Sequence, residues 1–122
     1  MAPGNGKLAS LAEAAELARG VARVALGGWS FSRRPLAVAM HWAAHGLRFD
    51  ELLVLIGGIE TDLLVAAGVA QRVRGFYLGM EALGMGPGLK GGYEVIEETE
   101  TSLMLGLTAA VEGQSFLPLP AR

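Results

Sequence analysis

The stretch VALGGWSFSRRPLAVAMHWAAHG, residues 24–46, decides the fold, because an apolar run in it ends at two glycines and gives way to a helical pattern. The apolar run over 22–28 is short and ends in Gly27 and Gly28, which is typical of a buried strand. Pro35 then falls within the first turn of a helix, where its missing N–H costs nothing. The stretch therefore predicts one strand, one glycine turn and one helix, in this order.

The alternation of strands and helices continues on both sides of this stretch. Helices are predicted over 10–20, 35–46, 60–67 and 101–113, and strands over 22–28, 51–58, 72–79 and 93–98. Ser10 and Glu13 stand at the spacing of a capping box, which supports a helix start there. The alternation predicts an α/β fold, with a mostly parallel open sheet flanked by helices and right-handed crossovers.

Three of the predicted strands end in glycine, at Gly28, Gly58 and Gly79. Because parallel strands present their carboxyl ends at one edge of a sheet, we expect these glycines to lie at the same edge. Ligands of open α/β sheets bind outside this edge. It is therefore the expected place of a binding site.

The length and composition fit a single domain over 1–122, with 1–7 as a flexible tail. A net charge of −2 gives no electrostatic basis for binding nucleic acid or an acidic membrane. The chain has no cysteine, which excludes disulfides, thiolate metal sites and a cysteine nucleophile. Its apolar runs are far shorter than the roughly 20 residues of a membrane span. Because the first residues do not resemble a secretion signal, we expect a cytoplasmic protein.

Two patterns resemble known ligand sites but lack essential residues. In GMGPGLKGG, residues 84–92, a glycine follows Lys90 where a P-loop needs a hydroxyl, so a flexible loop is predicted. His41 and His45 have the i, i+4 spacing that lets two imidazoles share a metal, but no third ligand stands out. Exposed or packing histidines without a metal are the preferred interpretation, and a shared metal is the alternative.

An acidic run in the last third of the chain has two interpretations. Glu97, Glu98 and Glu100 are typical of a solvated strand edge and helix start, with a catalytic carboxylate as the alternative. A dinucleotide site is weakly supported, because no Gly-x-Gly-x-x-Gly pattern follows the first predicted strand.

The glycine turn of the opening stretch offers a binding site of its own. Backbone N–H groups at Gly27 and Gly28 can hold a carbonyl or carboxylate oxygen. Arg33 and Arg34, beside a helix start, add positive charge that suits a carboxylate or thioester substrate. A tight turn with two solvated arginines explains the residues equally well.

The opening stretch resembles the first strand, glycine turn and helix of the A subunit of class I coenzyme A transferases. The residues that match that family's signature are Val24-Ala25-Leu26, Gly27-Gly28, Trp29 and Pro35, whereas Arg33 stands where the general signature has glycine. The Arg-Arg-Pro form resembles the glutaconate transferase branch and its relatives that open steroid-derived rings. The resemblance continues through LLVLIGGIETDLLVAAGVAQRV, GFYLGMEALG and ETETSLMLGLTAAVEGQSFLPLP, and covers roughly 8–120.

The resemblance implies the coenzyme A transferase superfamily fold, which sugar-phosphate isomerases also have. It implies an A-type subunit of a two-component enzyme that exchanges coenzyme A between an acyl-CoA and a carboxylic acid. A B-type partner subunit would supply the glutamate nucleophile and most contacts to coenzyme A, the co-substrate. No position here corresponds to that glutamate, so no catalytic residue is assigned and the isolated chain is predicted to be inactive. The implied substrate-binding residues are Gly27, Gly28, Ser30, Arg33 and Glu81.

Two departures from the family pattern keep other functions open. Family A subunits continue well beyond the part that resembles FLPLP, and between MEALG and YEVIEE this chain lacks their charged helical segment. The alternatives are a hydrolase or ring-opening subunit acting on a CoA thioester, and a non-catalytic module for acyl-CoA binding or assembly. The high apolar content in one short sheet predicts that a B-type subunit or a second copy covers exposed surface.

Overall fold

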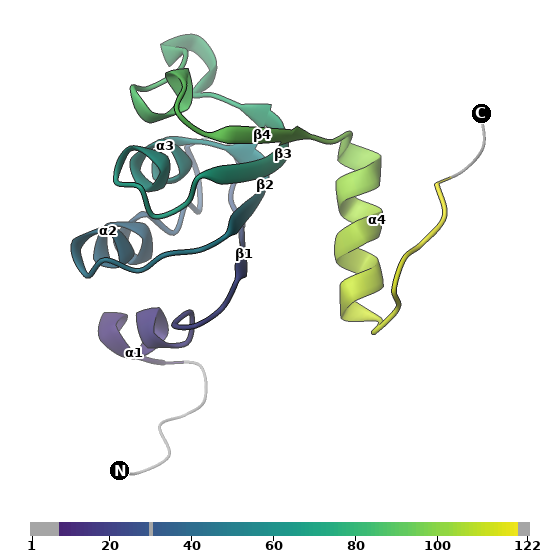
Figure 1. The fold of residues 1–122 in the computed structure, drawn as a ribbon, viewed down its shortest axis with the longest axis horizontal. Coiled ribbons are helices and arrows are strands. Elements are labelled where there is room, and N and C mark those ends of the chain that lie inside the picture. Colours follow the sequence, from purple (N-terminus) through teal and green to yellow (C-terminus); the bar gives the residue numbers. More distant parts are fainter. Residues whose placement is uncertain (1–7, 30, 120–122) are drawn as a thin grey trace.

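A four-stranded parallel sheet forms the centre of the structure, a computed structural model that describes residues 8–29 and 31–119. Its strands are β1 (Arg23–Leu26), β2 (Glu51–Gly57), β3 (Arg72–Leu78) and β4 (Glu94–Glu97). They lie side by side in chain order, and all three neighbouring pairs are parallel (Figure 1). The predicted α/β fold with a parallel sheet is confirmed. The predicted tail, residues 1–7, lies outside the described residues.

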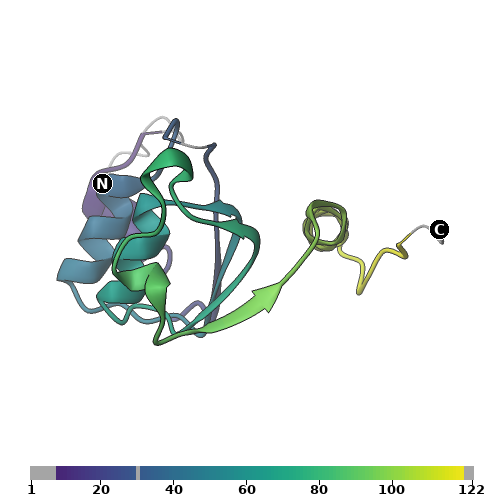
Figure 2. The same cartoon turned by 90° about the horizontal axis from the view of Figure 1, so that it is seen from above.

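Helices cover the two faces of the sheet unequally. The helices are α1 (Leu11–Glu16), α2 (Leu36–Ala44), α3 (Ile59–Ala66) and α4 (Glu100–Val111). Figure 2 shows α1, α2 and α3 together on one side of the sheet and α4 on the other. None of the helices in the described part of the chain is long and apolar enough to cross a membrane.

The hydrophobic core lies between the sheet and the three helices α1, α2 and α3. Strand β2 shows why, since Leu52 and Val54 alternate along it and are almost fully buried, whereas Leu53 and Leu55 on its other face are partly exposed. Buried core residues are Ala15, Leu26, Ala39, Trp42, Leu47, Phe49, Leu52, Val54, Leu64, Val69, Ala70 and Val73. One face of the sheet is therefore well packed, and the other is covered only in part.

The start of α1 follows the predicted capping box. Ser10 Oγ accepts a hydrogen bond from the Glu13 N–H at 3.2 Å, and Glu13 Oε2 accepts one from the Ser10 N–H at 2.8 Å. The start of α2 differs slightly from the prediction, because Pro35 is the residue just before the helix and not part of its first turn. Proline still suits this place, since its missing N–H is one that a helix start leaves without an intrahelical partner.

The loop between β3 and β4 is packed against α3. It contains two short 3₁₀ turns, η1 (Glu81–Leu83) and η2 (Gly88–Lys90). The Leu89 N–H donates to Asp62 Oδ1 at 2.9 Å, and Leu89 itself is buried. The predicted loop over 84–92 is present. It was predicted to be flexible, but at Leu89 it is held against α3.

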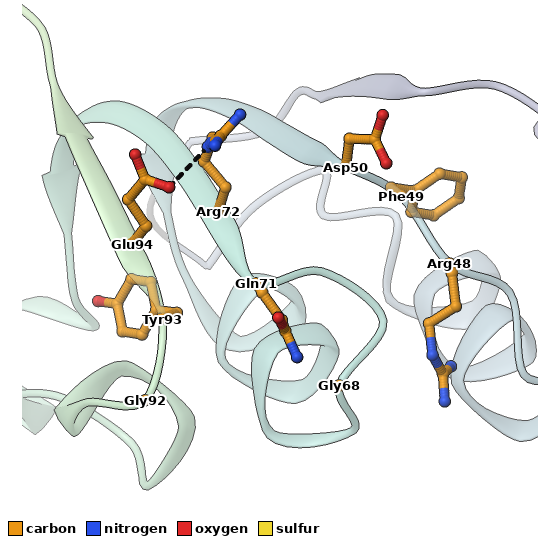
Figure 3. Close-up of a pocket in the computed structure, with 9 residues that line it drawn as sticks. All are labelled: Arg48, Phe49, Asp50, Gly68, Gln71, Arg72, Gly92, Tyr93 and Glu94. Atoms are coloured by element: carbon orange, nitrogen blue, oxygen red, sulfur yellow. Dashed lines mark hydrogen bonds and ion pairs between the residues drawn. The ribbon is translucent and has the colours of Figure 1, made fainter.

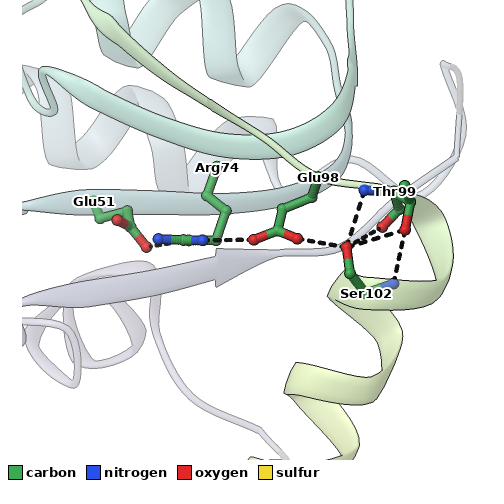
Figure 4. A network of polar contacts seen from close by, with 5 residues as sticks. All are labelled: Glu51, Arg74, Glu98, Thr99 and Ser102. Atoms are coloured by element: carbon green, nitrogen blue, oxygen red, sulfur yellow. Dashed lines mark hydrogen bonds and ion pairs between the residues drawn. The ribbon is translucent and has the colours of Figure 1, made fainter. Parts of the chain in front are cut away.

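A polar network ties the start of α4 to the sheet (Figure 4). Arg74 on β3 donates to Glu51 at 2.9 Å and to Glu98 at 2.5 Å, and Ser102 on α4 donates to Glu98 at 2.5 Å. The hydrogen bond from Ser102 and the contact with Arg74 lower the pKa of Glu98. Glu98 therefore has a structural partner on both sides, and it is partly buried where a solvated edge was predicted.

Candidate functional site at the carboxyl edge of the sheet

The glycines that follow β1, β2 and β3 meet at one edge of the sheet. The register pairs Leu26 with Val54, so that Gly28 and Gly58 both follow the strands at that edge. The Gly79 N–H donates to the Gly57 carbonyl at 2.9 Å, which places the third glycine beside the second. The prediction that the glycine-ended strands finish together is confirmed.

The side chain of Arg34 lies buried between the first two of these turns. It is only 4% exposed, and its Nη1 donates to the Ile56 carbonyl at 2.6 Å. The same nitrogen lies 2.9 Å from Oε1 of Glu60, a residue that is 0% exposed and lies in the first turn of α3. Arg34 thus joins the entry of α2 to the end of β2 and the entry of α3.

Both turns need glycine because the Arg34 side chain passes so close to them. Gly28 has φ +125°, which L side chains rarely adopt, and a Cβ there would lie 2.8 Å from Arg34 Cδ. At Gly58 a Cβ would lie 3.0 Å from Arg34 Cζ and Nη2. Gly28 and Gly58 therefore make room for one buried arginine.

Glu60 supplies the counter-charge in a position that suits an anion. It lies in the first turn of α3, where the helix dipole and the free N–H groups favour negative charge. Its Oε1 accepts from Arg34 and from Thr61 Oγ1, the latter at 3.3 Å, whereas its Oε2 has no hydrogen-bond partner among the described residues. A buried pair of this kind holds its two elements in one arrangement, because either charge alone would be costly to bury.

Arg33 and Glu81, two of the predicted site residues, share an unusual backbone conformation. Their φ angles are +55° and +50°, and no other non-glycine residue in 8–29 or 31–119 has a positive φ. Such backbone strain tends to concentrate at functional sites. Both residues are exposed at the carboxyl edge. In the described chain no hydrogen bond or ion pair connects one of them to the other. Ser30, the third predicted residue there, lies outside the described residues.

The two arginines differ in a way that the sequence does not reveal. A pair of solvated arginines describes the exposed Arg33 but not the buried Arg34. Two neighbouring residues at a helix start would point about 100° apart. Here the helix begins only at Leu36, and the left-handed backbone at Arg33 turns the chain before it. The ion pair with Glu60 was also missed, since nothing in the sequence connects these positions.

A small apolar cavity opens beside the first glycine turn. Its volume is about 230 Å³, and it lies between α4 and the sheet face that carries β1 and β2. Its lining residues are Ala25, Leu26, Gly27, Gly28, Leu53, Val54, Leu55, Leu103, Met104 and Leu107. Within the described residues, the N–H groups of Gly27 and Gly28 donate no hydrogen bond. Gly27 and Gly28, whose N–H groups have no hydrogen-bond acceptor among the described residues, therefore line an apolar space.

A larger cavity, of about 680 Å³, lies at the opposite edge of the sheet (Figure 3). Its polar lining balances two arginines, Arg48 and Arg72, against two acids, Asp50 and Glu94. Arg72 is already paired with Glu94 at 2.9 Å. This cavity surrounds the amino ends of β2, β3 and β4 and contains none of the predicted site residues.

His41 on α2 and His45, the residue just after this helix, stack on each other. Their ring centroids lie 3.9 Å apart, and His45 Nδ1 lies 2.9 Å from the His41 carbonyl oxygen. In the part of the chain that the structure describes, no group of three or more His, Cys, Asp or Glu residues could hold a metal ion. The geometry thus favours packing histidines.

Comparison with known proteins gives an informative similarity to a solved structure. No protein-family model matches the chain, and no curated protein sequence matches it. Among solved structures, it is similar to the crystal structure of a variant of the decarboxylase AibA/AibB, with 28% sequence identity and a TM-score of 0.81. The match covers 92% of this chain and 46% of that chain, so this chain spans about half the length of the solved one. The chain therefore has the parallel α/β fold of the coenzyme A transferase superfamily.

Proposed function

We propose that the chain is the A-type half of a two-component coenzyme A transferase, which exchanges coenzyme A between an acyl-CoA and a carboxylic acid. The observation that carries this proposal is the pair of N–H groups at Gly27 and Gly28, which are available at the rim of an apolar cavity. The structural similarity to the decarboxylase AibA/AibB, whose name joins two components, supports the existence of a partner subunit.

The proposed chemistry divides the work between two chains. A carboxylate has a poor leaving group, so a glutamate nucleophile on the partner would divide the exchange into easier steps. Its attack on the acyl-CoA would release the CoA thiolate and form an acyl anhydride. The thiolate would then attack the glutamyl carbonyl, release the first acid and leave a glutamyl-CoA thioester for the acceptor acid. When the acyl carbonyl is attacked, its oxygen gains negative charge. N–H groups at Gly27 and Gly28 would stabilise that charge, and one such donor is worth about 2.7–4 kcal/mol in other enzymes.

The remaining predicted residues have roles at the same edge. Arg33 is exposed, and its guanidinium forms no hydrogen bond or ion pair with a described residue, so it is available for the carboxylate of the acceptor acid. Ser30 and Glu81 complete the set that would face the substrates. The buried Arg34 would hold the two glycine turns in place without touching the substrate.

Purification with the partner tests this proposal. The chain is isolated from its native host, and any co-purifying B-type chain is identified by mass spectrometry. The complex is then mixed with an acyl-CoA and a second carboxylic acid, and the new acyl-CoA is measured. We expect exchange by the complex and none by the isolated chain. Turnover by the isolated chain that disappears in Glu81→Gln would contradict a partner-borne nucleophile, and binding without turnover in any complex would favour an acyl-CoA-binding module.

A decarboxylase is the second candidate, because the similar solved structure is that of a decarboxylase. In that case Arg33 would hold the carboxylate that leaves as CO₂. Release of labelled CO₂ without any need for an acceptor acid would support this candidate over a transferase. Release of free coenzyme A without an acceptor would instead indicate a thioester hydrolase.

A further inference from the structure

We propose that the apolar cavity beside Gly27 and Gly28 is the acyl pocket of this site, and that it takes an uncharged, mainly unbranched acyl chain of about six to eight carbons. This inference rests on the proposed function, because it assigns the thioester carbonyl to the glycine turn. It adds the chemical class of the acyl group, which the fold leaves open.

The lining of the cavity determines which chemical class fits. All of its lining residues are apolar or glycine, and neither a charged nor a hydroxyl-bearing side chain is among them. Placing a second carboxylate there would strip it of water without a partner, at a large cost in free energy. The charged Arg33 and Glu81 do not line this cavity, although they lie at the same edge of the sheet. An acyl chain ending in a methyl group fits, and a dicarboxylic one does not.

The volume sets the length of the chain. The cavity measures about 230 Å³. A water-sized group takes about 30 Å³ in a liquid, and a methylene group is similar in size, which gives room for roughly seven such groups. This space is too small for a helix or a partner's loop, so a single narrow chain is its natural occupant.

The position of the cavity gives the acyl chain a direction. It begins at Gly27 and Gly28, whose N–H groups are available to the carbonyl, and continues along Ala25 and Leu53 beneath α4. Met104, at 46% exposure, is the most exposed of the large side chains around it and marks the side open to solvent. The thioester would therefore lie at the turn, and the methyl end would lie between α4 and the sheet.

A chain-length series on the whole purified chain tests the inference. The probes are acyl thioesters of N-acetylcysteamine, from acetyl through butyryl, hexanoyl and octanoyl to dodecanoyl, with free N-acetylcysteamine as the blank. Binding is measured by NMR titration, because these small thioesters need no partner subunit. Each methylene buried should tighten binding about fourfold. We expect the affinity to rise up to six to eight carbons and then to stop rising or fall.

Three variants make the series specific to this cavity. Ala25→Leu fills the pocket from an exposed strand position and should shorten the best chain by about three carbons, the number that leucine adds to alanine. Met104→Ala opens the pocket and should lengthen the acyl chain that binds best. Ala37→Leu makes the same change on an exposed face of α2 and should leave the series unchanged. Thermal unfolding confirms that each variant is folded.

The outcomes separate the inference from the proposed function. Affinity that does not depend on length, or a length dependence that ignores Ala25→Leu, would overturn the inference. The same acyl groups are then tested as CoA thioesters with the partner complex. If the length dependence holds but coenzyme A adds no affinity there, the proposed function fails and the apolar pocket stands. If coenzyme A adds affinity but the length of the acyl group has no effect, the acyl pocket fails and the proposed function stands. A lack of binding by every probe overturns both the pocket and the proposed function.

Discussion

Arg34 Nη1 lies 2.9 Å from Oε1 of Glu60, and this single contact joins the entries of α2 and α3 across the ends of two strands. Both side chains are almost completely buried, at 4% and 0% exposure. The Arg34 side chain passes close to both Gly28 and Gly58, so the pair lies directly beside the two glycine turns. A buried ion pair therefore lies behind the candidate site and can support it without contacting a ligand.

Removing one partner of this pair should destabilise the fold strongly. We expect Arg34→Ala to lower the free energy of unfolding by about 3–5 kcal/mol, because it leaves the Glu60 charge buried and uncompensated. Urea denaturation at neutral pH measures the change. Arg33→Ala is the matched control, and as an exposed substitution it should cost less than about 0.5 kcal/mol. Equal, small effects at both positions would show that the buried contact is not formed.

Glycine-to-alanine substitutions should change the stability of the fold in opposite directions at two positions. Gly58→Ala brings a Cβ to 3.0 Å from the Arg34 guanidinium and should destabilise the protein. Gly106→Ala, within α4 and with nothing inside 4 Å, should instead stabilise it by about 0.5–1 kcal/mol. Thermal unfolding of the two variants compares them. When Arg34 is also replaced by alanine, the loss of stability caused by Gly58→Ala should be smaller. An unchanged loss would mean that Gly58→Ala acts through the backbone conformation and not through contact with Arg34.

The polar network at α4 should weaken in acid. The pKa of Glu98 is lowered in the folded state, so its contribution to stability is complete above the pKa of an unperturbed glutamate, about 4.3. That contribution is lost as the pH falls through the folded pKa. We expect Glu98→Gln to flatten this part of the pH dependence in urea denaturation. Glu97→Gln, at its exposed neighbour, should leave the profile as it is, and a similar flattening there would contradict the assignment.

Arg33 should matter for binding and not for stability. If it holds a substrate carboxylate in the partnered enzyme, Arg33→Ala should weaken binding or turnover by about 1.5–3 kcal/mol, the usual worth of a charge-assisted hydrogen bond. Arg33→Lys keeps the charge but loses the planar fork, so we expect partial rescue. Steady-state kinetics of the two variants beside the wild type decide this. Unchanged kinetics would place Arg33 on the surface, outside the site.

The sequence predicted the sheet better than it predicted the site. Short apolar runs that end at Gly28 and Gly58 define strands by local chemistry alone, and their parallel pairing follows from the helices between them. The role of Arg34 depends instead on Glu60, which is distant in the sequence and lies in the first turn of another helix. Local patterns do not contain such a contact.

The acyl pocket was missed for a related reason. It forms between β1, β2 and α4, so its lining comes from three segments that are distant in the sequence. Leu103 and Leu107 lie within the predicted helix 101–113, and no local pattern indicates which strands they meet. The loop before β4 shows the same limit, since its glycines suggested flexibility and Asp62 anchors it from α3.

The order of the strands has a consequence for the way this chain acquires its structure. Each strand pairs with the strand that comes immediately before it in the chain, so no strand waits for a distant partner. Contacts that are near in sequence cost less loop entropy and form faster. Because synthesis delivers the amino-terminal part first, β1, α2 and β2 emerge from the ribosome as a complete unit. We expect the sheet to grow one strand at a time during translation, with the pocket closing last, when α4 arrives.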